Sequence, residues 1–340
     1  MLKIARKLAK RAFMGVASVA GRHNRPCSQP LLWVLMYHRV IPYAQAVAEG
    51  EEPGMYVTPD TFARHLEWIR ECMPVVRLKD WCAQAGAKGS LAPKACAITF
   101  DDGWRDNLIH ALPALQAQQM PATVFVVSGL TGANRPFWPN RLSRLLTEQP
   151  HAVATAPGLA WLRELALQVE GGLDAALRKP DARAALISLC KQHPDELLLA
   201  RMEDAEREAQ VGQPASRDIL NWDEVRQMMA SGLVDIGSHT CSHTRLRDDI
   251  PSERIRREVI ESRARIASEI ETAVDLFCYP NGDYTPATAA LVASAYRGAV
   301  TTRSGINDAN AALCELKRIG MHQHVSSSRS AFRARLSGWV

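Results

Sequence analysis

Two groups of polar side chains have the types and spacing of a metal-dependent hydrolytic site. Asp101 and Asp102 directly follow the apolar run at 95–100, and His239 and His243 follow a second short run at 234–237. One carboxylate and two imidazoles can bind a divalent cation and leave open positions for water and substrate. We therefore expect Asp102, His239 and His243 to be metal ligands, which leaves Asp101 free to act as a base.

Parallel strands are needed to bring these two groups together. An apolar run that ends abruptly in polar residues is typical of a buried parallel strand, whose carboxyl end lies at the rim where α/β folds place their active sites. Further strands are expected at 31–38, 75–78, 122–127, 276–279, 298–302 and 316–321. Helical patterns separate most of them. This alternation predicts an α/β fold, a distorted (β/α) barrel of about seven parallel strands.

Residues 131–220 interrupt the alternation. This stretch has no convincing strand, is rich in Leu, Ala, Glu and Arg, and is punctuated by prolines. We interpret it as a helical insertion on the barrel rim, with helices near 141–148, 159–170, 173–178, 181–192 and 195–209. The expected organisation is a basic N-terminal arm and linker at 1–30, the barrel at 31–325 with the insertion inside it, and a basic C-terminal tail at 326–340.

Three further local predictions concern the barrel itself. Residues 41–57 are expected to be a loop, because they contain several glycines, prolines and acidic residues. A helix over 106–119 must be kinked or broken by Pro113. A long charged helix is expected over 251–272.

The same motifs carry a family resemblance. Thr99-Phe100-Asp101-Asp102-Gly103 and His239-x-x-x-His243 resemble the first two signature motifs of the polysaccharide deacetylases, the NodB-homology carbohydrate esterases. Leu35-Met36-Tyr37-His38-Arg39-Val40 resembles the first strand of one subgroup, and Phe277-Cys278-Tyr279-Pro280-Asn281-Gly282 resembles the third motif of that subgroup. The resemblance extends in order over roughly residues 31–322.

The resemblance implies metal-dependent hydrolysis of an N-acetyl group on a sugar of a polysaccharide or glycolipid of the cell envelope, with release of acetate. The cation, expected to be Zn²⁺, would polarise the carbonyl and lower the pKa of a bound water, and Asp101 would take the proton of that water as general base. His38, Tyr279 and Trp104 are expected to contact the glycan substrate.

Two positions depart from the family pattern. The third motif usually has an arginine that orients the base, and Cys278 stands there instead. We expect Arg318, at the end of the last predicted strand, to pair with Asp101 in its place, because a base beside a metal needs a cation to fix its carboxylate. The usual Leu-x-His motif that supplies the acid has no clean match, and His324 is the candidate acid.

The sequence is also compatible with two other functions. One is a carbohydrate-binding pseudoenzyme of the same fold, which the missing arginine and the lack of a clear acid favour and the intact Asp101 opposes. The other is an amide hydrolase that acts on a small non-sugar substrate. The sequence does not define the glycan.

The net charge of +5 is concentrated at the N-terminus. Residues 1–25 hold seven basic residues and no acidic one, and in the rest of the chain acidic residues slightly outnumber basic ones, which argues against nucleic-acid binding. Over residues 1–20 the apolar positions share one helical face, which favours a helix on an anionic membrane surface. A secretory signal peptide cleaved after Ala20 and a solvated tail are the alternatives.

The cysteines indicate the compartment. Eight are scattered along the chain without a Cys-x-x-Cys pair, which favours a reducing environment. We therefore expect a cytoplasmic protein associated with a membrane surface, or a periplasmic or secreted one if residues 1–20 are a signal peptide.

Overall fold

A parallel barrel forms the body of the protein. A computed structural model describes residues 12–135, 137–212 and 217–339 of the chain. In the order in which they pair, the barrel strands are β1 (Leu31–Tyr37), β4 (Lys94–Phe100), β5 (Ala122–Val126), β6 (Val234–Ser238), β7 (Leu276–Cys278), β8 (Gly298–Ser304) and β10 (Leu316–Gly320). The barrel is closed because β1 also pairs with β10, with Leu35 opposite Ile319. The predicted fold class is confirmed.

Strand β1 shows why the barrel strands appear in the sequence as continuous apolar runs. Its side chains alternate between two buried surfaces: Leu32 and Val34 join the cluster inside the barrel, and Trp33 and Leu35 join the cluster between the barrel and its helices. A parallel strand covered on both faces has no solvent-facing side, so no polar alternation appears in its sequence. A short strand, β9 (Asn307–Asp308), pairs antiparallel with the start of β1.

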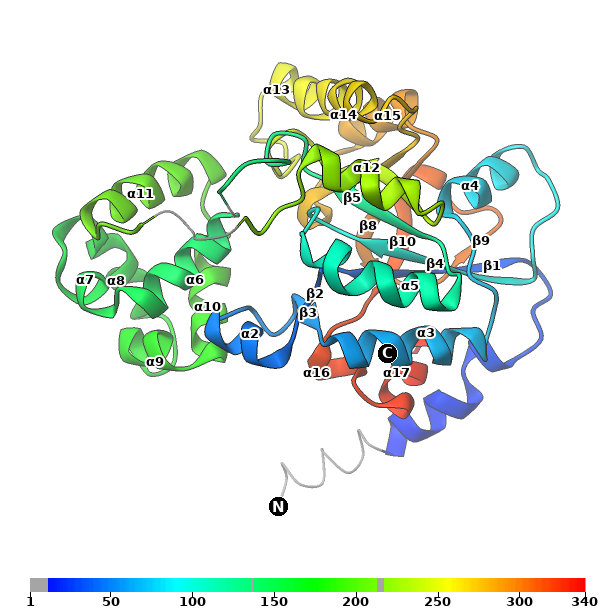
Figure 1. The fold of residues 1–340 in the computed structure, drawn as a ribbon, viewed down its shortest axis with the longest axis horizontal. Helices are drawn as coiled ribbons and strands as arrows, with labels where there is room; N and C mark the ends of the chain where they lie inside the picture. The colour runs from blue at the N-terminus through cyan, green and yellow to red at the C-terminus, as the bar shows by residue number, and fades with distance from the viewer. Residues whose placement is uncertain (1–11, 136, 213–216, 340) are drawn as a thin grey trace.

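Helices cover the outside of the barrel (Figure 1). They are α3 (Pro59–Arg70), α5 (Leu112–Gln118), α12 (Trp222–Ala230), α14 (Ser262–Ile270), α15 (Pro286–Ala295), α16 (Gln323–Ser326) and α17 (Arg329–Leu336). Another helix, α4 (Leu78–Gly86), packs Trp81 and Cys82 against the cluster inside the barrel. Local signals fix several helix starts: the Thr58 side chain caps α3, and Asn221 and Glu224 form a capping box at α12.

A helical lobe stands to one side of the barrel, at the left of Figure 1. Its helices are α6 (Trp138–Glu148), α7 (Pro150–Thr155), α8 (Ala160–Ala166), α9 (Gly172–Arg178), α10 (Pro180–Cys190) and α11 (Asp195–Glu208). The lobe has its own hydrophobic cluster, which includes Leu145, Leu162 and Leu186. The buried Arg245, from the loop after β6, ties the lobe to the barrel by hydrogen bonds to the carbonyl of His193 (2.6 Å) and to Asp195 (2.9 Å).

Two local predictions differ from the structure. Residues 75–78 form a single bridge between Val75 and Cys96 and then the start of α4. Within 41–57 the chain forms α2 (Tyr43–Ala48) and β3 (Tyr56–Val57), which pairs with β2 (Arg39–Val40). Ion pairs explain why this segment is structured and not a loop, because the buried Arg39 donates hydrogen bonds to Glu49 and Glu51 at 2.6 Å each.

The expected helices over 106–119 and 251–272 each contain a π-helical turn. The first runs over Asn107–Ala111 and leads into α5, where Pro113 lies in the first turn and needs no hydrogen-bond partner for its nitrogen. The second, Arg257–Glu261, joins α13 (Ser252–Arg256) to α14. The irregularity expected from Pro113 is therefore the π-helical turn that directly precedes α5, and the second π-helical turn has no such cause in the sequence.

Two global properties complete the description. Within the described residues, no helix combines the length and apolar character that crossing a bilayer requires. All eight cysteines lie in the described part of the chain, and each is a free thiol.

Candidate metal centre and active site

Two loops at the carboxyl rim of the barrel carry the expected ligands. Asp101 and Asp102 follow β4, and His239 to His243 follow β6. Three non-glycine residues in these loops have a left-handed backbone: Asp102 (φ 77°), Thr240 (φ 68°) and His243 (φ 58°). Such a backbone costs of order 1–3 kcal/mol per residue and is tolerated where the surroundings impose it. Its concentration in the loops after β4 and β6, two strands that both pair with β5, marks the rim as a functional site.

Asp102, His239 and His243 converge on one point. The Asp102 Oδ1 atom lies 3.4 Å from His239 Nε2 and 3.5 Å from His243 Nε2. The two imidazole rings are nearly perpendicular, with their centroids 4.8 Å apart. The three residues predicted as metal ligands are thus brought together.

These atoms fit a divalent cation. A tetrahedral zinc ion with ligands at about 2.0–2.1 Å requires ligand atoms about 3.3 Å apart, close to the separations between Asp102 and each histidine. The His239 ring is already oriented, because its Nδ1 contacts the carbonyl oxygen of Cys278 at 2.8 Å. Because a carbonyl oxygen only accepts, this hydrogen bond places a proton on Nδ1, and Nε2 is the ring nitrogen that faces Asp102.

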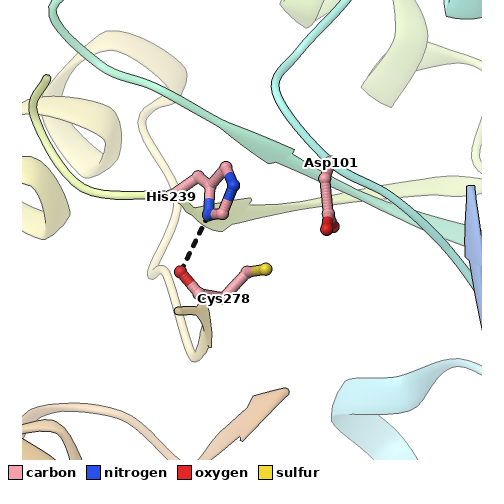
Figure 2. A group of neighbouring side chains, drawn as sticks. All are labelled: Asp101, His239 and Cys278. Atoms are coloured by element: carbon pink, nitrogen blue, oxygen red, sulfur yellow. Dashed lines mark hydrogen bonds between the residues drawn. The ribbon is translucent and has the colours of Figure 1, made fainter. Parts of the chain in front are cut away.

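A second group of possible ligands, Asp101, His239 and Cys278, lies beside the first (Figure 2). It is a poor cation site for three reasons. Both oxygens of Asp101 accept hydrogen bonds from Arg318, His239 uses its Nδ1 atom toward Cys278, and burial raises the pKa of the Cys278 thiol, so that it stays protonated. We therefore assign the cation to Asp102, His239 and His243.

Asp101, which follows β4, is held by an arginine of β10, the strand on the other side of β1. Arg318 of β10 donates from Nη1 and Nη2 to the two carboxylate oxygens of Asp101, each at 2.7 Å. Both side chains are buried, and the guanidinium also donates to the carbonyl of Thr301 at 2.8 Å and contacts the Cys278 sulfur at 3.2 Å. The predicted pairing of Arg318 with Asp101 is confirmed, and the small Cys278 leaves room for it.

The charges of the site follow from this packing. Burial alone would raise the pKa of Asp101, but the Arg318 guanidinium outweighs it and holds that pKa below its ordinary value. The pKa of Asp102 is also lowered, because the neighbouring imidazoles outweigh its burial. Burial, with the nearby His239 as the next cause, lowers the pKa of His243 to about 4. Both carboxylates are therefore ionised at neutral pH, and His243 is neutral, as a metal ligand must be.

A further set of contacts fixes the ligands. The Trp104 indole N–H donates to Asp102 Oδ2 at 3.0 Å, which leaves Oδ1 free to face the histidines. The buried Glu258, in the π-helical turn before α14, accepts hydrogen bonds from the backbone N–H groups of Cys241 (2.8 Å) and Ser242 (3.0 Å). Glu258 thereby holds the loop that carries both histidines.

The four remaining predicted site residues differ in how close they lie to the two carboxylates. His38, at the end of β1, lines the crevice and lies 3.9 Å from Asp101, between its Nε2 and the Oδ2 atom. Trp104 is almost fully buried and supports Asp102, so it is a positioning residue more than a substrate contact. Tyr279 is fully buried and donates to the carbonyl of Cys314 at 3.0 Å, away from the crevice. His324 is exposed and lines a different cavity, so the structure does not bring it to Asp101.

The crevice lies between the barrel rim and the helical lobe and has a volume of about 310 Å³. The lobe contributes polar side chains to its wall, among them Asn140, Arg141 and Lys191. Phe137 packs its ring against the edge of His243, with centroids 5.1 Å apart, and closes one side. This arrangement suits a hydrophilic molecule whose reacting group reaches the carboxylates and histidines at the base of the crevice.

Comparison with known proteins identifies the family. The family described as polysaccharide deacetylase matches residues 88–156 and 190–297, just over half of the chain, and both ligand loops lie inside the matched segments. The protein belongs to the polysaccharide deacetylase family, whose members are hydrolases acting on carbon–nitrogen bonds. The unmatched residues 157–189 lie within the helical lobe.

Solved structures show the same fold. The Streptococcus pyogenes deacetylase PplD, in complex with acetate, is 18% identical over 88% of this chain and 96% of its own, with a TM-score of 0.58. IcaB from Ammonifex degensii is 19% identical over 91% of this chain and 98% of its own, with a TM-score of 0.56. No curated protein sequence matches this chain. At these identities the structural similarity concerns the fold alone.

Proposed function

We propose that this protein hydrolyses the N-acetyl group of an amino sugar in an envelope polysaccharide or glycolipid and releases acetate. The observation that carries the proposal is the pairing of Asp101 with Arg318 at the edge of the Asp102, His239 and His243 cluster. An ionised, immobilised carboxylate beside a cation site is the arrangement that amide hydrolysis by water requires.

The cation that we propose is Zn²⁺, held by Asp102, His239 and His243. When bound, it supplies a Lewis acid that polarises the amide carbonyl and makes water more acidic. Trp104 and Glu258 keep the ligands in place, because one bonds the second oxygen of Asp102 and the other bonds the histidine loop.

The chain's own residues manage the protons. Asp101 accepts a proton from the attacking water, and the Arg318 fork keeps its carboxylate ionised and aimed into the crevice. The departing amine needs a proton in return. We assign that role to His38, because its Nε2 lies 3.9 Å from Asp101 and His324 lies in another cavity. On the motif alone, we also propose that the chain belongs to the subgroup whose first strand resembles Tyr37-His38-Arg39-Val40.

The proposal also bears on the two rival functions. The main argument for a non-catalytic binding protein was the missing arginine of the third motif, and Arg318 supplies a guanidinium to the same carboxylate. An amide hydrolase for small non-sugar substrates would use the same groups, and only the products distinguish it.

The test is acetate release by Zn²⁺-loaded protein from a panel of N-acetylated oligosaccharides, glycolipids and small N-acetylated amides. We expect release from a glycan, full metal content but little turnover in Asp101→Asn, and loss of metal without unfolding in His239→Ala. An asparagine cannot accept the water proton, but it leaves the ligand set intact. Metal loss in Asp101→Asn would mean that the roles of the two carboxylates are reversed. Glycan binding without any acetate release would establish the pseudoenzyme.

A further inference from the structure

Three apolar side chains project from one side of the N-terminal helix at residues 12–20. Phe13, Val16 and Val19 are 49%, 59% and 73% exposed. Their spacing of three residues places them along one face of the helix. The opposite face is buried against the body, with Ala17 fully covered and Ser18 nearly so. The predicted membrane-binding segment 1–20 lies partly in this helix, and residues 1–11 are outside the described part of the chain.

The C-terminus continues the same surface. The Arg22 backbone N–H donates to the carbonyl of Ser337 at 3.2 Å, and Arg333 donates to the side-chain oxygen of Asn24 at 2.7 Å. The Arg25 guanidinium stacks over the ring of Trp339 at 5.5 Å, and that ring is 42% exposed. Figure 1 shows the N-terminal helix near α17 at the bottom of the barrel, whereas the helical lobe lies at the left.

Gly21 makes this contact between the termini close. A side-chain carbon at position 21 would lie 2.5 Å from the Cβ atom of Ser337, so only glycine allows the two segments to approach this far. Residues 21–25 and 333–339 therefore pack closely together into one surface. We call the exposed side chains Phe13, Val16, Val19 and Trp339 the apolar ridge.

The charge around the apolar ridge is predominantly positive. The sequence contains no acidic residue before Glu49 and none after Glu315, and both terminal segments are rich in arginine and lysine. Arg22 and Arg25 are exposed beside the ridge. A neighbouring helix contributes one acid, Glu71, which pairs with Arg329 and lies 4.0 Å from Arg333. The surface thus combines projecting apolar groups with a strongly basic surround.

We propose that the apolar ridge docks the protein on an anionic lipid membrane, with the N-terminal helix lying in the plane of the interface. Basic side chains near an anionic leaflet each contribute attraction, and apolar side chains on an interfacial helix insert to the depth of the headgroup boundary. The ridge projects from the body and carries only four apolar side chains, which suits insertion between lipids better than the large complementary area of a stable protein interface. Trp339 has the amphipathic ring that favours the same depth.

The test is co-flotation of the full chain with vesicles of phosphatidylglycerol and phosphatidylcholine, compared with phosphatidylcholine alone. We expect binding to the anionic vesicles, at least tenfold weaker binding in Phe13→Asp/Val19→Asp, and a similar loss in Arg22→Glu/Arg25→Glu or in high salt. Leu167→Asp is the matched control, because Leu167 is 83% exposed on the helical lobe and its replacement should leave vesicle binding unchanged.

Several results would overturn the proposal. These are equal binding by the wild type and the Phe13→Asp/Val19→Asp variant, equal binding to neutral vesicles, or a mature protein that begins near Gly21 in an exported fraction. A lipid-free dimer that light scattering detects and that Val19→Asp abolishes would make the ridge a self-association surface. Acetate release from a soluble glycan is measured in parallel and should be unchanged in every variant, so failure of membrane docking is distinguishable from failure of the proposed deacetylase activity.

Discussion

Replacement of Arg318 by lysine tests how the proposed base is held. Arg318 donates five hydrogen bonds from its guanidinium, two of them to Asp101. An ammonium keeps the charge, but it has three donors at a single point and cannot reproduce the paired contact with both carboxylate oxygens. Loss of one hydrogen bond to a buried charge corresponds to about 1.5–3 kcal/mol, so we expect kcat to fall roughly 10- to 150-fold.

The pH dependence of turnover gives an independent readout. Asp101 acts as a base only when ionised, so turnover is lost as the pH falls through its pKa. In the wild type Arg318 holds that pKa below its ordinary value, against the effect of burial. Removal of the guanidinium in Arg318→Met leaves burial uncompensated, which raises the pKa and moves the acidic limb of the kcat profile to higher pH. Metal content and thermal melting are measured alongside to separate these effects from unfolding.

A second-site change sharpens the experiment. The Cys278 sulfur lies 3.2 Å from Arg318 Nη2, so an arginine introduced at position 278 can reach the same carboxylate. We expect Cys278→Arg to restore part of the turnover that Arg318→Ala loses, whereas Cys278→Ala alone should change little. Wild-type kcat in Arg318→Lys, together with an unmoved acidic limb in Arg318→Met, would refute the positioning role.

Three other predictions use different measurements. Trp104→Phe removes the N–H that bonds Asp102 and should weaken metal binding about 10- to 100-fold by competition titration, while the fold is kept. His38→Ala should lower turnover strongly and His324→Ala should not, because only His38 lies beside Asp101. Burial lowers the pKa of His65 from an ordinary 6.5 to about 4, so its contribution to stability is complete above pH 6.5 and is lost as the pH falls to about 4. Urea unfolding should therefore show a loss of unfolding free energy over this range that is about 3 kcal/mol smaller in His65→Gln than in the wild type, because His243 and His322, whose pKa values burial also lowers to about 4, still contribute in the variant.

The sequence predicts the parts of the site that follow from where the strands end and from their parallel direction. Apolar runs that end in Asp101 and His239 specify strand ends, and parallel strands must bring their carboxyl ends to one rim. The partner of Asp101 was also predictable, because a buried base needs a cation and Arg318 lies in the last predicted strand, which closes the barrel against β1. The helices of the lobe were predictable because leucine periodicity and prolines mark them locally.

Other features depend on packing that the sequence does not display. Glu258 is an ordinary glutamate on a charged helix until the fold places it under the histidine loop. The sequence makes His324 the candidate acid and His38 a substrate contact, and only the fold shows that His38, after β1, lies beside Asp101 and that His324 lines another cavity. From the sequence, Trp104 could contact the substrate or support a metal ligand. The hydrogen bond from its buried indole N–H to Asp102 indicates the second role.

The π-helical turn at Arg257–Glu261 is best understood as one residue added to an otherwise regular helix. In an α-helix each residue advances the side-chain direction by 100°. Deletion of one residue from this turn would restore regular winding and swing Glu258 about a quarter-turn around the helix axis relative to α14. The backbone N–H groups of Cys241 and Ser242 would then lose their acceptor. The position of the histidine loop thus depends on the number of residues in a helix that contributes no ligand. A deletion of a single codon in that helix can therefore disable the site, although every ligand residue is still encoded.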